Sequence, residues 1–237
     1  DSRGVIAMDK LSNLFVNGCS FLTHRHTHEA DINFNVGEMV KDQANIDNFI
    51  NYARGGRGND RIFLTTMTYF EKFPHMKKDT FVLIGWSSAL RLDYPTKDDF
   101  KRMPDLDQCW STIKMAESIS QFDNLPAKKQ PINHVDWEVQ RYFQNVLGLQ
   151  NYLKVNNIRY VMYNALPQPE IRKNDHHTLY RSIDKKHFFD ADSSQYYYCQ
   201  VNDRFISTTD HHPSEKGIEE WAGMVWQHIK ENKLYEI

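Results

Sequence analysis

The sequence predicts a three-layer α/β fold with a mostly parallel central sheet. Short apolar runs that indicate buried strands alternate along the chain with longer segments of helical spacing, which implies parallel βαβ units with helices on both faces of a sheet. The clearest strand is Thr80–Trp86 (TFVLIGW), a continuous β-branched and aromatic run typical of a strand covered on both sides. A length of 237 residues, 40% of them hydrophobic, suits one domain with a substantial core.

The domain is expected to span residues 8–237, with Met8 as the native start and residues 1–7 as cloning remnants. Besides Thr80–Trp86, strands are predicted at 14–17, 49–53 and 158–164. Helices are predicted at 36–44, 60–70, 136–156 and 214–230. The second of these helices opens after Asn59, a residue type that favours the N-cap.

Two longer segments lack clear periodicity. Residues 93–131 are polar and punctuated by proline, and we expect an insertion with one helical segment near 109–122. Residues 167–203 are predicted to form irregular surface loops. The helical spacing of Trp137, Trp221 and Trp226 places all three in the core.

Composition excludes several classes of function. Lys and Arg number 29 against 31 Asp and Glu, so the formal charge of −2 gives no reason to expect nucleic acid or an anionic membrane as partner. No apolar run approaches the roughly 20 residues that span a bilayer, and no secretory signal is visible. Cys19, Cys109 and Cys199 fit neither a disulfide framework nor a zinc pattern, which indicates a reducing, cytoplasmic location.

A serine follows the first predicted strand directly, in the sequence Gly18-Cys19-Ser20. The carboxyl end of a buried strand is where open α/β sheets bind ligands, and the glycine permits a sharp turn there. The same pattern also fits an ordinary turn serine.

Near the C-terminus, Asp210 and His212 flank His211 and precede Pro213 and a helix. A serine hydroxyl needs a base to take its proton, and the base needs a carboxylate to hold its tautomer and stabilise its charged form. One rigid turn could supply both groups, although a helix N-terminus with ordinary capping explains the spacing equally well.

Other polar groups fall at strand ends or helix starts. The glycine-rich 55–58 turn before the second helix could present backbone N–H groups to an oxyanion or cradle a phosphate. It lacks the lysine and the spacing of a P-loop, which disfavours nucleotide binding. Ser87 and Arg91 follow the best strand and are expected to face the same crevice as Ser20.

With these motifs in this order, the sequence resembles the SGNH hydrolase family, the GDSL-type esterases and lipases. Gly18-Cys19-Ser20 is similar to the block that carries the nucleophile, and residues 51–59 to the block whose glycine joins the oxyanion hole. Residues 84–87 occupy the place of the third block, and Asp210-x-His212-Pro213 resembles the last one. The set is also similar to SGNH-like proteins of phages and marine microbes.

The resemblance implies a flavodoxin-like fold and hydrolysis of an ester, as in an esterase or carbohydrate O-deacetylase, through an acyl-enzyme without cofactor or metal. It makes Ser20 the nucleophile, His212 the base and Asp210 its partner, with a small-molecule or glycan ester as substrate. The N–H groups of Ser20 and Gly56 would bind the oxyanion with Ser87 assisting, and Asn59 or Arg91 are further candidates.

The chain departs from the family pattern in three places. Cys19 stands where an Asp is usual, Ser87 stands where an Asn donates to the oxyanion, and Asp210 and His212 are separated by one residue rather than two. The first two departures leave open a catalytically silent domain that binds a carbohydrate or a protein. The alternating His24, His26 and His28 leave open, less favourably, a metal-dependent hydrolase.

Overall fold

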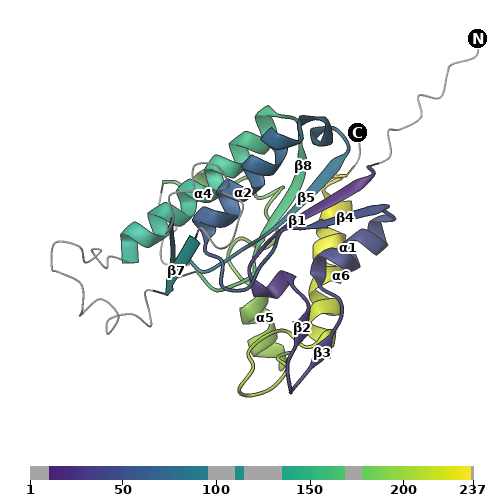
Figure 1. Cartoon of the computed structure of the whole chain (residues 1–237), viewed down its shortest axis with the longest axis vertical. Helices are drawn as coiled ribbons and strands as arrows, with labels where there is room; N and C mark the ends of the chain where they lie inside the picture. Colours follow the sequence, from purple (N-terminus) through teal and green to yellow (C-terminus); the bar gives the residue numbers. More distant parts are fainter. Residues whose placement is uncertain (1–10, 96–109, 115–134, 169–177, 236–237) are drawn as a thin grey trace, which may run out of the picture.

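The computed structural model describes residues 11–95, 110–114, 135–168 and 178–235. Its centre is a sheet of four strands: β1 (Asn13–Gly18), β4 (Asn48–Asn51), β5 (Thr80–Trp86) and β8 (Arg159–Asn164). Their order is β4-β1-β5-β8, and every neighbouring pair is parallel (Figure 1). The predicted fold class is therefore confirmed, and each strand lies within two residues of its predicted bounds.

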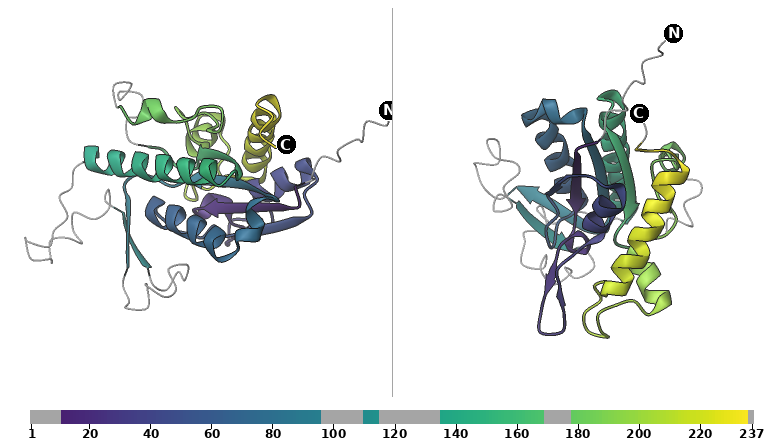
Figure 2. Two further views of the ribbon diagram at one scale, coloured as in Figure 1. Left: turned by 90° about the horizontal axis from the view of Figure 1, so that it is seen from above. Right: turned by 90° about the vertical axis from the view of Figure 1, so that its right-hand side faces the viewer.

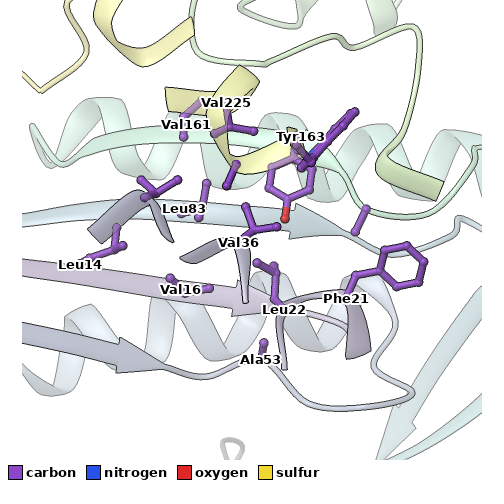
Figure 3. Close-up of a cluster of buried hydrophobic side chains, with 14 of the residues drawn as sticks. Leu14, Val16, Phe21, Leu22, Val36, Ala53, Leu83, Val161, Tyr163 and Val225 are labelled. Atoms are coloured by element: carbon purple, nitrogen blue, oxygen red, sulfur yellow. The ribbon is translucent and has the colours of Figure 1, made fainter. Parts of the chain in front are cut away.

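Helices cover both faces of this sheet (Figure 2). On one face lie α1 (Val36–Ala44) and α6 (Glu215–Glu231); on the other lie α2 (Asn59–Lys72) and α4 (Val135–Val155). Figure 3 shows the interface between the sheet and the helices α1 and α6. Leu14, Leu83 and Val161 of the strands face Val36 of α1 and Val225 of α6. Burial on both faces is the reason β5 is continuously apolar after Thr80 rather than alternating.

The helices begin where capping groups satisfy their free N–H groups. Asn35 and Glu38 form a reciprocal capping box at α1, and Ser214 caps α6. The prediction of Asn59 as the N-cap of α2 is wrong, because Gly58 holds that position and has no capping side chain. The buried carboxylate of Asp93, which lies in another segment of the chain, caps α2 instead. It accepts hydrogen bonds from the Gly58 N–H at 3.1 Å and from the Arg61 N–H at 3.0 Å.

Asp93 belongs to β6 (Arg91–Pro95), which pairs antiparallel with β7 (Trp110–Lys114). The helical segment expected near 109–122 is thus wrong over 110–114, where aromatic and β-branched residues pair as a strand, and its remainder lies outside the described residues. Of the predicted loop region 167–203, residues 169–177 lie outside the described residues. Residues 178–203 are more regular than predicted. They contain a 3₁₀ turn, η8 (Tyr180–Ser182), and α5 (Gln195–Asn202), which Ser194 caps.

Of the three tryptophans expected in the core, Trp221 is fully buried and Trp226 is half-buried. The prediction for Trp137 is wrong, because its side chain is 51% exposed. It lies in the first turn of α4, whose N-terminal end extends past the sheet (Figure 2).

The chain moves from β1 outward to β4 and then crosses back to β5 on the other side of β1. This reversal places a switch point between β1 and β5, and ligands of open α/β sheets bind outside the strand ends at such a point. The fold therefore directs attention to the residues that follow Gly18 and Trp86. Within the described residues, no helix is long and apolar enough to cross a bilayer.

Candidate active site

Ser20 stands immediately beyond β1, at the start of a 3₁₀ turn, η1 (Ser20–Leu22). The turn is tight because β1 ends on a glycine. A Cβ at Gly18 would lie 2.4 Å from the Leu22 side chain and 2.7 Å from the Gly85 carbonyl oxygen. Ser20 is half-buried, while the preceding Cys19 points into the core and is fully buried.

The loop before α6 brings two more of the predicted residues to this serine. His212 Nε2 lies 2.9 Å from Ser20 Oγ, and His212 Nδ1 lies 2.6 Å from Asp210 Oδ1. The His212 backbone N–H also donates to Asp210 Oδ1 at 3.2 Å. The three side chains are thereby in one continuous hydrogen-bonded line, the arrangement in which a histidine and a carboxylate can activate a serine hydroxyl.

The surroundings favour neutral His212 beside ionised Asp210. Burial lowers the pKa of His212, and the charges of Arg25 and Arg91 lower it further against the opposing effect of Asp210. Burial alone would raise the pKa of Asp210, but hydrogen bonds and charge from His212 and Arg25 hold it below its ordinary value. A neutral imidazole is the form that can accept a proton from a hydroxyl.

Arg25 was not among the residues that the sequence indicated. It lies on β2 (Arg25–His26), which pairs with β3 (Asp31–Ile32) in a hairpin beside the loop that precedes α6 (Figure 1). Its Nε and Nη2 donate to Asp210 Oδ2 at 3.0 and 2.8 Å. At the hairpin tip, Glu29 accepts hydrogen bonds from the hydroxyls of Ser207 and Thr209.

We refer to Arg25 and Glu29 with their partners as the hairpin clasp. It contacts three residues of the loop that carries His212, namely Ser207, Thr209 and Asp210. The residues that bond to each other are about 180 positions apart in the chain, so no local spacing could have revealed them.

Around Ser20 opens a cavity of about 620 Å³. Apolar surface comes from Phe21, Leu166 and Tyr196. The polar lining consists of Ser20, Arg25, Thr27, His28, Glu29, Arg91, Thr209, Asp210, His211 and His212. Of the further candidates from the sequence, Arg91 is therefore at the cavity.

The other candidates do not line it. Ser87 is fully buried, and its hydroxyl accepts from Arg91 at 3.0 Å and contacts the Cys19 thiol. The Asn59 side chain pairs with the backbone of Ser87, accepting from its N–H at 2.8 Å and donating to its carbonyl at 2.9 Å. Gly56 sits in an exposed turn with φ +78°, a conformation that favours glycine.

The three alternating histidines each pair with a different carboxylate. His24 lies 2.8 Å from Glu38, His26 lies 2.6 Å from Asp31, and His28 lies 3.3 Å from Glu29. In the part of the chain that the structure describes, no three His, Cys, Asp or Glu side chains converge as metal ligands.

Comparison with known proteins bears on the fold. No family model matches the sequence, and no curated protein matches it. Among solved structures, the psychrotrophic esterase EstA from Pseudoalteromonas sp. aligns over 93% of this chain and 97% of its own, with a TM-score of 0.50. The chain shares the fold of that esterase.

Sequence identity with that esterase is 12%. TesA aligns at 11% identity over 93% of this chain and 99% of its own, with a TM-score of 0.49. A GDSL-like lipase from Parabacteroides merdae aligns at 13% identity over 97% of this chain and 99% of its own, also with a TM-score of 0.49. At such identities, what these proteins do does not transfer to this chain.

Proposed function

We propose that this protein is a serine hydrolase of the SGNH kind that cleaves esters through an acyl-enzyme. The observation that carries the proposal is the hydrogen-bonded line from Ser20 Oγ through both nitrogens of His212 to Asp210 Oδ1. It lies at the switch point of an α/β sheet and opens into a cavity large enough for a small ester.

In the first half-reaction, Ser20 Oγ attacks the ester carbonyl carbon while His212 Nε2 takes the hydroxyl proton. Asp210 keeps the Nδ1 proton facing it and stabilises the imidazolium that forms. The tetrahedral intermediate then collapses, the bond to the alcohol oxygen breaks, and His212 gives its proton to that oxygen. Water repeats the same steps on the acyl-Ser20 ester and releases the carboxylic acid.

The oxyanion of the intermediate needs hydrogen-bond donors. The Ser20 N–H opens a 3₁₀ turn and donates to no other group among the described residues. Ser87 and Gly56 lie away from the cavity lining, so we assign the Ser20 N–H as the principal donor. Loss of one oxyanion donor costs about 100- to 1000-fold in rate, and the enzyme is expected to be correspondingly slow.

A fluorophosphonate probe tests the proposal, because it reacts with an activated serine without the correct substrate. The solved esterase from Pseudoalteromonas is described as inhibited by monoethylphosphonate. Mass spectrometry should find one adduct, on Ser20, which disappears in Ser20→Ala and His212→Ala. Ser182→Ala, at an exposed serine of η8, is the matched control and should label normally.

Esters of small carboxylic acids and acetylated glycans then serve as substrates. An adduct on Ser20 together with turnover of any ester supports the proposal. No adduct on a sample that unfolds cooperatively would contradict it and favour a silent domain that binds a glycan or a protein.

A further inference from the structure

Arg91 has a fixed position at the cavity wall. It opens β6 directly after the loop that follows β5. Its Nη1 donates to Ser87 Oγ at 3.0 Å and to the Arg57 carbonyl at 3.4 Å. Its own carbonyl oxygen accepts from Arg141 at 3.0 Å. Both the backbone and one edge of the guanidinium are therefore held before any ligand arrives.

In the part of the chain that the structure describes, Arg91 nevertheless has no carboxylate partner. Three other arginines near it pair with carboxylates: Arg25 with Asp210, Arg61 with Asp93, and Arg141 with both Asp60 and Glu138. Among the described residues, no carboxylate lies within 4.0 Å of Arg91, and its Nε and Nη2 donate to no protein group. These two nitrogens form the edge of a guanidinium that pairs with a carboxylate through two parallel hydrogen bonds.

The acidic groups at the cavity are already engaged. Asp210 accepts from His212 and Arg25. Glu29 accepts from the hydroxyls of the hairpin clasp and lies 3.3 Å from His28. Arg91 thus supplies a positive charge that no described carboxylate pairs with, within a partly buried site where an anionic ligand gains more from it than in bulk water.

We propose that Arg91 binds a carboxylate of the substrate, so that the preferred substrates are esters that carry a carboxylate on their acyl or alcohol part. Phe21, Leu166 and Tyr196 on the apolar wall would contact the hydrocarbon between the carboxylate and the ester. This inference rests on the proposed function for its substrate class, but the binding of the carboxylate itself does not require turnover.

The test uses matched esters that differ in one charge. On the acyl side, the 4-methylumbelliferyl monoester of succinate is compared with the butyrate ester. On the alcohol side, 4-acetoxybenzoate is compared with 4-acetoxybenzamide. The variants are Arg91→Gln, Arg91→Lys and, as control, Arg159→Gln, which lies at the start of β8 and donates to the Lys78 carbonyl. Binding of the same esters is measured by calorimetry in the Ser20→Ala protein with and without Arg91→Gln.

In at least one pair, the charged ester should be preferred by roughly 10- to 100-fold in kcat/KM, the effect of a charge-assisted bidentate pair. Arg91→Gln should remove that preference, because it lowers kcat/KM of the charged ester roughly 10- to 100-fold more than that of its uncharged partner, and Arg91→Lys should fall between. Arg159→Gln should change neither.

An equal loss on both members of a pair would overturn the inference, because it would place Arg91 at the oxyanion, which every ester shares. Absence of any preference would overturn it as well. If no ester is hydrolysed but the Ser20→Ala protein binds the charged esters more tightly through Arg91, the proposed function fails and the carboxylate site stands.

Discussion

Replacing Arg25 with glutamine should change both the rate and the pH dependence of the proposed hydrolase. Arg25 donates two hydrogen bonds to Asp210 Oδ2, and the Asp210 side chain is only 9% exposed. A charge-assisted pair to a nearly buried carboxylate contributes about 1.5–3 kcal/mol, which we discount to about 1–2 kcal/mol because Arg25 itself is one-third exposed. If the interaction between Arg25 and Asp210 stabilises the transition state by this amount, kcat/KM of Arg25→Gln at neutral pH falls roughly 5- to 30-fold below that of wild type.

The direction of the pH effect follows from the charge that is lost. The reaction needs neutral His212, so kcat/KM rises as the pH passes upward through the pKa of this imidazole. Arg25 lowers that pKa, although burial lowers it more. Removing the positive charge raises the pKa of His212, and the acid limb of the profile moves to higher pH. The loss of activity should therefore be greater at pH 6 than at pH 8.

The assay is a pH profile of kcat/KM for wild type, Arg25→Gln, Arg25→Lys and the control Arg159→Gln. Lysine keeps the positive charge but cannot donate two parallel hydrogen bonds to Asp210. The acid limb of the Arg25→Lys profile should therefore stay close to that of wild type while kcat/KM falls. An acid limb that is unchanged or moves to lower pH in Arg25→Gln would refute the reasoning, even if the rate falls.

Three further predictions concern stability and reactivity. Gly18→Ala should lower the melting temperature by about 4–8 °C, because the new Cβ would lie 2.7 Å from the Gly85 carbonyl oxygen and such overpacking costs about 2 kcal/mol. An unchanged melting curve would contradict this. Asp93→Asn should reduce the free energy of unfolding, measured in urea, by about 2–4 kcal/mol, because it removes a buried charge beside Arg61 and weakens the cap of α2. A loss below about 0.5 kcal/mol would contradict this and show that an amide can cap α2 as well as the carboxylate does. Burial raises the pKa of the Cys19 thiol and raises that of the Cys199 thiol to about 12. Iodoacetamide at pH 8 should therefore leave both cysteines unmodified until the protein is denatured, and modification of either one in the folded protein, detected by peptide mapping, would contradict this.

Sequence patterns succeeded where structure depends on local composition. Thr80–Trp86 is a strand with the predicted bounds because its side chains are apolar on both faces. The capping box of Asn35 and Glu38 lies within four residues, and α1 covers the predicted 36–44. The serine and the Asp-x-His element were visible because each follows or precedes a regular element directly.

Groups that act across the chain were not predictable in the same way. Asp93 caps α2 from another segment, so Asn59 looked like the cap and instead holds the backbone of Ser87. Arg25 lies between His24 and His26 in a polar segment, and its partner Asp210 is 185 residues away. Only the folded backbone makes these pairs neighbours.

The contacts of the hairpin clasp determine how late in folding Ser20 can become activated. Ser20 and His212 are 192 residues apart, and the loop that carries His212 leads into α6, which packs against the sheet. Contacts of such long sequence separation form late and reward their loop-closure cost only when the rest of the sheet is in place. A chain emerging during synthesis would therefore carry an unactivated Ser20 until α6 docks. Recovery of probe labelling during refolding would then report the docking of α6 rather than early collapse.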